Sequence, residues 1–236
     1  MPSLTRIETA KVVLVEDHEM FREQLAQLIG KLGPFQICGQ ANNIKSAMEL
    51  IQWERPDIAI VDISLRGSSG LELVKDLKAQ RLDVPVLMLS MHAEALYAER
   101  AIRAGAKGYV SKHEGTEKLL EAIQCVLDGG VYLSEKMTSR VLGNLSGPAQ
   151  LGALGGMELL SDRELEVFQM LGQGFNTRQI AHSINLGETT VDTYRTRIRL
   201  KLQLRNAAEL YNRATQWVRS EEEAESASAA VFGITG

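Results

Sequence analysis

Four short, mainly apolar runs in this chain each end in a charged or hydroxyl residue, and this arrangement restricts the fold more than any other feature. Such runs, when helical patterns separate them, are typical of buried parallel strands. Each polar residue would therefore lie at the carboxyl end of a strand. The runs and their terminal residues are 11–15 with Glu16 and Asp17, 58–61 with Asp62, 84–89 with Ser90, and 107–111 with Lys112.

The segments between these runs carry apolar residues at helical spacing, and residues 36–41 predict a further strand. Five strands that alternate with five helices predict an α/β domain with a doubly wound, five-stranded parallel sheet of the flavodoxin-like kind. Its crossovers are expected to be right-handed. The predicted helices cover residues 20–32, 44–51, 71–80, 94–104 and 117–127.

Polar side chains should gather at the carboxyl edge of this sheet, where open α/β domains bind their ligands. Three crowded carboxylates repel one another, and Mg²⁺, which prefers oxygen ligands and keeps several waters, relieves that repulsion. We therefore predict a magnesium and phosphoryl site with Asp17 and Asp62 as direct ligands and Glu16 acting through water. Taken singly, the carboxylates could instead cap the following helices, Ser90 could be a turn residue and Lys112 a solvated side chain.

Beyond this domain the pattern becomes that of a small all-α domain. Ser161 with Glu164, and Asn176 with Gln179, have the spacing of capping boxes at the starts of two helices. A turn and two more helices are predicted at 185–187, 189–202 and 206–218.

Composition separates the remaining parts of the chain. Glycines interrupt the segment between the two domains, which predicts a linker, and the Glu-, Ala- and Ser-rich end of the chain predicts disorder. The four predicted segments are 9–133, the strand-and-helix domain; 134–157, the linker; 158–219, the helical domain; and 220–236, a disordered acidic tail.

The overall composition favours a cytoplasmic protein. No apolar run approaches the roughly 20 residues that span a membrane, and Cys38 and Cys125 have neither pair nor metal spacing, which suits a reducing compartment. The four histidines, which include His18 and His92, are scattered along the chain, so we expect surface or packing residues rather than metal ligands.

In their order, the acidic pair, Asp62, Ser90 and Lys112 resemble the receiver domain of two-component response regulators, over residues 11–133. Residues 158–218 resemble the helix-turn-helix of the NarL/FixJ (LuxR-type) subfamily. The resemblance implies a receiver domain, a DNA-binding domain and a histidine kinase that phosphorylates the receiver.

The same resemblance assigns roles to individual residues. Asp62 becomes an aspartyl phosphate, while Ser90 and Lys112 hold the phosphoryl oxygens. The backbone carbonyl of Ser64 completes the metal ligands, and Tyr109 swings inward when the serine hydroxyl moves toward the phosphate.

Three residues depart from the family pattern around this site. Arg66 stands where proline is common, and Met91 and His92 stand where small residues are common. These departures bear on the lifetime of the phosphorylated state.

The second helix of a helix-turn-helix places its N-terminal part in the major groove. Residues 195–205 hold five basic residues and no acidic one, which suits nucleic acid. Short side chains near the helix start, Asp192, Thr193 and Thr196, are the candidates for base contacts, and Asp192 replaces a common lysine. The candidates for phosphate contacts are Arg178, Thr190, Arg195, Arg199 and Lys201.

We therefore predict a transcription regulator that is switched by phosphorylation and binds double-stranded DNA, as a homodimer when phosphorylated. Two alternatives stay open: a DNA-binding or scaffold protein that is never phosphorylated, and a phosphoaspartate phosphotransferase. In the haloacid dehalogenase enzymes a second Asp lies two residues after the nucleophile, and Ser64 in that position argues against an enzyme.

Overall fold

The computed structural model describes residues 9–65, 68–91, 94–134, 137–138 and 156–231. It divides into two compact units, Met1–Thr138 and Ser139–Gly236, each of which is described by itself. Arg66, His92 and most of the predicted linker lie outside the described residues.

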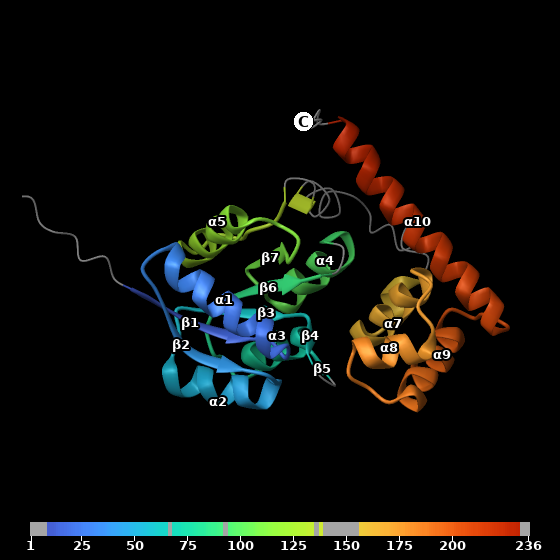
Figure 1. The fold of residues 1–236 in the computed structure, drawn as a ribbon, viewed down its shortest axis with the longest axis horizontal. Helices are drawn as coiled ribbons and strands as arrows, with labels where there is room; N and C mark the ends of the chain where they lie inside the picture. Colours follow the sequence, from blue (N-terminus) through green and yellow to red (C-terminus); the bar gives the residue numbers. More distant parts are fainter. Residues whose placement is uncertain (1–8, 66–67, 92–93, 135–136, 139–155, 232–236) are drawn as a thin grey trace, which may run out of the picture. The chain divides into compact units, whose positions relative to one another are not determined.

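A five-stranded parallel sheet forms the centre of the first unit, with strand order β2-β1-β3-β6-β7 (Figure 1). All four strand pairings are parallel, so the predicted α/β architecture is confirmed. The strands are β1 (Ala10–Val15), β2 (Phe35–Ala41), β3 (Ile58–Asp62), β6 (Val86–Ser90) and β7 (Gly108–Ser111).

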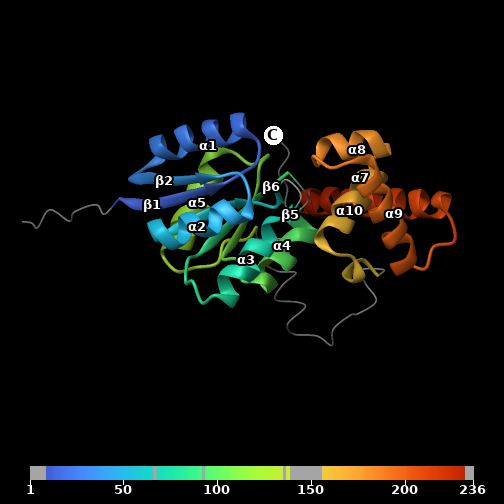
Figure 2. The same cartoon turned by 90° about the horizontal axis from the view of Figure 1, so that it is seen from below.

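Helices cover both faces of this sheet (Figure 1 and Figure 2). Successive strand residues point to opposite faces, so Leu14, Ile60 and Leu89 share one face, where Ile29 and Ile123 of two helices join them in the core. These two helices are α1 (Glu19–Leu32) and α5 (Thr116–Leu127). On the other face, α2 contacts α3 and α3 contacts α4. Their bounds are α2 (Ile44–Glu54), α3 (Gly70–Ala79) and α4 (Glu94–Ala104).

A small antiparallel pair that the sequence did not predict follows the end of β3. It consists of β4 (Ser64–Leu65) and β5 (Ser68–Ser69), and it leads directly into α3. Gly70, the first residue of α3, lies so close to β3 that a Cβ atom there would be 2.1 Å from the carbonyl oxygen of Asp62. The absence of a side chain therefore lets α3 begin directly beside the end of β3.

The chain that leaves α5 returns to the outer edge of β7. The backbone N–H of Tyr109 donates to the carbonyl of Tyr132 at 3.0 Å, and the N–H of Tyr132 donates to the carbonyl of Lys107 at 2.9 Å. A parallel bridge joins Gly108 to Tyr132. The residues around Tyr132 therefore satisfy the backbone groups of the edge strand.

The second unit is helical, as predicted. Both predicted capping boxes are present, at Ser161 with Glu164 and at Asn176 with Gln179, and the core contains Phe168. The elements are η1 (Met157–Leu159), α7 (Asp162–Gly172), α8 (Thr177–Ser183), α9 (Glu188–Lys201) and α10 (Ala207–Val231).

The last helix corrects one prediction. α10 continues through Val231, so residues 220–231 are helical rather than disordered. The low apolar content of this segment predicts that it buries little surface, but its Ala and Glu residues have high helix propensity. Among the described helices, none combines the length and apolar character needed to cross a membrane.

Candidate functional site

Lys112 connects the acidic residues at the carboxyl edge of the sheet. Its Nζ lies 2.6 Å from Oε2 of Glu16 and 2.9 Å from Oδ2 of Asp62, although these residues are far apart in the sequence. All three side chains are buried, that of Lys112 being only 6% exposed. The ring of Phe21, with its centroid 4.5 Å from the ammonium, packs against it. The predicted edge therefore contains a buried ammonium that two carboxylates share.

Burial shapes the protonation of this group. Burial raises the pKa of Asp62 to about 7, with the charge of Glu16 adding to the rise and the ammonium of Lys112 opposing it. Burial also works to lower the pKa of Lys112, but the charges of Asp62 and Glu16 overcome it and hold that pKa above its ordinary value. The ammonium of Lys112 alone is therefore too little to stabilise the negative charges of both Asp62 and Glu16.

Asp17 supplies the third carboxylate. Its side chain is 4% exposed, and its buried Oδ1 accepts no hydrogen bond from the residues that the structure describes. A buried carboxylate oxygen without a donor is costly, and a divalent cation would satisfy it. The donor set at this edge, mainly carboxylate oxygens, fits Mg²⁺.

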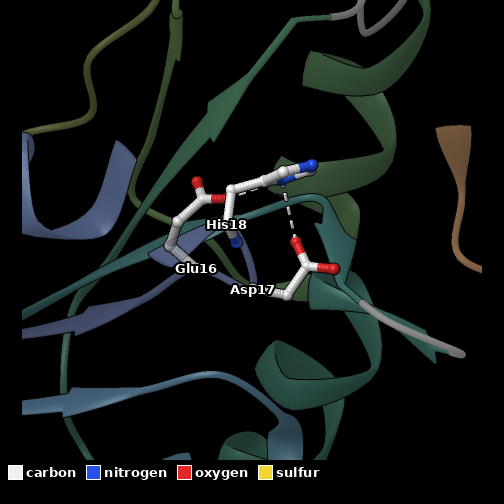
Figure 3. A group of neighbouring side chains, drawn as sticks. All are labelled: Glu16, Asp17 and His18. Carbon is white, nitrogen blue, oxygen red and sulfur yellow. Dashed lines mark hydrogen bonds and ion pairs between the residues drawn. The ribbon is translucent and has the colours of Figure 1, made fainter. Parts of the chain in front are cut away.

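His18 lies beside this group, and its side chain is 61% exposed, as expected for a surface histidine. Its Nδ1 lies 3.2 Å from Oε1 of Glu16 and 3.2 Å from Oδ1 of Asp17. Figure 3 shows the imidazole ring directed toward both carboxylates. These three residues form a group whose ligand atoms all lie within 4.8 Å of one another. The three residues are consecutive in the sequence, so the sequence alone already places this histidine beside the acidic pair.

Ser90 and Tyr109 lie on the two strands beside this group. Ser90 ends β6 and is fully buried, and its carbonyl accepts the backbone N–H of Lys112 at 2.7 Å. Tyr109, on β7, is also buried and pairs in register with Met88. Met91, which follows Ser90, is exposed at the surface.

Ser64 contacts the central aspartate through its backbone. Its N–H donates to the carboxylate of Asp62, which works to lower the pKa of that carboxyl group. The family resemblance implies that the carbonyl of Ser64 is a metal ligand, and the hydrogen bond from its N–H brings the backbone of this residue to Asp62.

The predicted DNA-reading helix is α9. Val191 and Ile198 are buried and attach it to the domain, while Asp192, Thr193 and Thr196 are exposed. Gly187 precedes α9, and the turn before it contains Asn185 in the left-handed conformation, with φ of 53°. The remaining candidates are also on the outside: Arg178, Thr190 and Lys201 are exposed, and Arg199 and Arg195 are half-buried.

Two of the predicted phosphate contacts are already paired within the domain. Nη1 of Arg195 donates to Oγ1 of Thr177 at 2.7 Å and to Oδ1 of Asp192 at 2.8 Å, and its guanidinium lies 5.5 Å from the ring centroid of Tyr211. Arg195 thus connects α8, α9 and α10. The Asp192 and Arg195 spacing of three residues on one helix face signals such a pair, but the contact with Thr177 depends on the packing of α8.

Lys201 is the second paired residue. Its Nζ lies 2.6 Å from Oε2 of Glu164, the buried acid of the first capping box. Burial alone would raise the pKa of Glu164, but Lys201 and the backbone N–H of Ser161 hold it below its ordinary value. Sequence reasoning found the capping box and the lysine separately and missed that they meet.

Both predicted domains match families of known proteins. Residues 12–124 match the response regulator receiver domain, and residues 158–214 match the luxR family of bacterial regulatory proteins. The chain is 34% identical over 205 residues to the transcriptional activator protein ExaE of Pseudomonas putida, covering 87% of this chain and 95% of that protein. It is 26% identical over 224 residues to the transcriptional regulatory protein DegU of Brevibacillus brevis, covering 89% and 95%.

Solved structures of response regulators are also similar to this chain. A LuxR-family two-component response regulator from an Aurantimonas species is 28% identical, with a TM-score of 0.54, covering 59% of this chain and 99% of that chain. RcsB from Salmonella enterica serovar Typhimurium, solved bound to a promoter with a phosphomimetic, is 20% identical, with a TM-score of 0.56, covering 88% and 98%. At 20% identity, the likeness to RcsB shows the fold alone.

Proposed function

The chain belongs to the response regulators that join a receiver to a LuxR-type helix-turn-helix, and on that basis we propose that Asp62 is the residue phosphorylated. The members of this family are phosphorylation-regulated DNA-binding transcription regulators and not enzymes. The observation that carries this proposal is the position of Lys112. Of the carboxylates at this edge, Asp62 and Glu16 are within ion-pair distance of that ammonium. Asp62 alone of these two ends the central strand, beside Ser90 on the neighbouring strand.

The proposed donor is the phosphohistidine of a histidine kinase. An oxygen of the Asp62 carboxylate forms the bond to phosphorus, while the bond from phosphorus to the imidazole nitrogen breaks and that nitrogen keeps the electron pair. Such transfers depend mainly on positioning and on charge stabilisation. Lys112 is placed to hold one phosphoryl oxygen by charge, and the Ser90 hydroxyl to hold another.

Asp17, Asp62, Glu16 and the carbonyl of Ser64 are the groups that we propose to hold Mg²⁺. When bound, this ion would neutralise negative charge on the phosphoryl group and on the carboxylates. The buried Oδ1 of Asp17, which accepts no hydrogen bond from the described residues, supports this assignment. The elevated pKa of Asp62 supports it too, because a nearby cation favours the ionised and nucleophilic carboxylate.

The proposed output is a change in self-association and in DNA binding. Phosphorylation would draw the Ser90 hydroxyl toward the phosphate and so favour the buried position that Tyr109 already has in this structure, which would change the surface around α4 and α5. We propose that a homodimer then presents two copies of α9 to paired half-sites. Base contacts are assigned to Asp192, Thr193 and Thr196. Phosphate contacts are assigned to Arg178, Thr190 and Arg199, and to Arg195 and Lys201 where DNA displaces their internal partners.

A labelling experiment tests the acceptor. The full chain and its Asp62→Asn variant are incubated with Mg²⁺ and a radiolabelled small-molecule phosphodonor. The variant should take up no label, whereas Asp76→Asn, which removes an exposed carboxylate on α3, should label normally. Equal labelling of Asp62→Asn and the unmodified protein would overturn the assignment.

A second experiment separates a switched regulator from a constitutive one. Sedimentation and DNA binding are measured with and without beryllofluoride, which mimics the phosphoryl group. A ligand shifts an equilibrium only by its differential affinity for the two states, so a higher mass together with tighter DNA binding supports the switch. An unchanged mass and an unchanged DNA affinity would favour the phosphorylation-independent alternative.

A further inference from the structure

The imidazole of His18 lies at the proposed cation site, although a carboxylate site for Mg²⁺ does not require an imidazole. The residue lies between Asp17 and the first residue of α1, and its side chain is 61% exposed. As the N-cap of α1 it forms no side-chain capping bond within the described residues. Its ring is directed instead toward the two carboxylates that precede it in the chain (Figure 3). A capping role therefore does not explain the position of this side chain, whose Nδ1 is hydrogen-bonded with Oε1 of Glu16 at 3.2 Å, a bond that a cation between the two atoms would replace.

The spacing of the three ligand atoms matches that of neighbouring ligands on one ion. Two adjacent ligands at about 2.1 Å from an octahedral cation are separated by about 3.0 Å. Nδ1 of His18 lies 3.2 Å from Oε1 of Glu16 and 3.2 Å from Oδ1 of Asp17. Oε2 of Glu16 can stay with Lys112 while Oε1 faces the ion. No large movement is needed to place a cation among the three atoms.

An independent observation also points to a ligand here. Oδ1 of Asp17 is buried and accepts no hydrogen bond from the described part of the chain. His18 Nδ1 is near it but does not complete a hydrogen bond to it. This oxygen is therefore available to a cation, and Nδ1 of His18 lies beside it at 3.2 Å.

We propose that His18 Nδ1 joins Asp17 and Glu16 as a ligand of the bound cation, and so makes the site favour first-row transition cations over Mg²⁺. Imidazole suits ions such as Ni²⁺, Zn²⁺ and Fe²⁺, whereas Mg²⁺ prefers oxygen and keeps its waters. The ligating ring carries its proton on Nε2, and the exposure of the side chain lets water accept that proton's hydrogen bond. This inference rests on the proposed cation site, and it does not depend on phosphoryl transfer.

The test compares Mg²⁺ with Ni²⁺, two octahedral ions of similar size that differ in their preference for nitrogen. Calorimetric titration gives the Kd of each ion for the full chain, prepared without a histidine tag and without phosphodonor. Carboxylate sites also bind Ni²⁺ more tightly than Mg²⁺, so the nitrogen ligand is reported by the change in the ratio of the two Kd values when the imidazole is removed.

His18→Ala should weaken Ni²⁺ binding by about tenfold or more and leave Mg²⁺ binding unchanged. His18→Asn should do the same while providing a good N-cap for α1, which keeps the fold intact. His182→Ala removes an exposed histidine of the helical unit and should change neither Kd. In the unmodified protein, paramagnetic Ni²⁺ should broaden the NMR signals of the His18 ring.

Four results would overturn the proposal. Unchanged Kd values for both ions in His18→Ala would show that the ring is no ligand. Tighter binding of both ions would show that the imidazole competes with the cation. Equal weakening of both would show that it only positions the carboxylates. Full Ni²⁺ binding by Asp17→Asn would place the ion elsewhere. Failure of the unmodified protein to bind Mg²⁺ would instead count against the proposed cation site, and labelling of Asp62 would still report on the acceptor.

Discussion

The two units of this protein use charge in opposite ways. In the receiver, a buried ammonium is shared by two buried carboxylates, with a third carboxylate alongside. On the helix-turn-helix, Asp192 is 59% exposed and its partner Arg195 is 22% exposed. Solvent screens the second arrangement and hardly reaches the first. The receiver charges should therefore control folding and phosphorylation, whereas the charges on α9 should adjust binding to DNA.

Removing Lys112 should give the largest effect and tests this comparison directly. Lys112→Ala leaves Glu16 and Asp62 buried without their ammonium, and breaking a buried pair from one side costs roughly 3–5 kcal/mol. Asp192→Asn should cost about 1 kcal/mol or less, as exposed pairs do. Urea unfolding of both variants without divalent cation measures the difference. Equal losses of stability would remove the distinction between the two units.

The pH dependence of stability should follow the raised pKa of Asp62. Its folded-state pKa is about 7, against an ordinary value of 3.8, so between those values the folded state binds more protons than the unfolded state. Without divalent cation, this group's contribution is full below about pH 4 and is lost as the pH rises to about 7, a change on the order of 4 kcal/mol.

Two comparisons isolate that contribution. Asp62→Asn should lack it, so the difference in unfolding free energy between the variant and the unmodified protein should change across pH 4 to 7. Mg²⁺ should reduce the pH dependence, because the cation favours the ionised carboxylate. A pH-independent difference would mean that Asp62 is already ionised at pH 4.

On the exposed surface of α9, Asp192→Lys should alter DNA binding in two separable ways. The added positive charge should raise affinity for any duplex and steepen its salt dependence. If the Asp192 carboxylate also accepts a hydrogen bond from a cytosine, its loss should change the preference at one base pair per half-site by roughly 1–3 kcal/mol.

Binding-site selection with both proteins separates these effects. Asp192→Asn serves as the control, because it releases Arg195 without adding a positive charge. An identical preferred sequence for all three proteins would show that Asp192 serves only to hold Arg195.

The smallest effect is expected at Lys201, which could act in either of two ways. If it contacts a phosphate, Lys201→Ala should lower the slope of log K against log salt by about 1. If it stays with Glu164, the slope should not change, and the variant should lose about 1 kcal/mol or less of stability. Measuring both quantities on one protein decides between the roles.

The sequence predicted those features that depend on the order of elements. The apolar runs predict parallel strands, and parallel strands carry Glu16, Asp62 and Lys112 to one edge whatever their loops do. Which carboxylate meets the ammonium was not predictable, because Glu16 reaches Lys112 through the length and direction of its side chain.

Most of the missed features are contacts between side chains or between distant backbone segments. The pairing of Lys201 with Glu164 and the contact of Arg195 with Thr177 require the packing angles of three helices. The helical state of residues 220–231 was missed for another reason, since disorder was inferred from low burial alone although helix propensity was high.

The return of the chain to β7 has a practical consequence for dividing this protein into parts. A receiver fragment that ended at Leu127, the last residue of α5, would lack Tyr132 and leave the N–H of Tyr109 and the carbonyl of Lys107 without their backbone partners. An uncovered strand edge is a template for pairing with another chain. Such a fragment should aggregate or dimerise through β7, and its self-association would be an artefact of the cut. A fragment that ends at Ser134 keeps the edge covered.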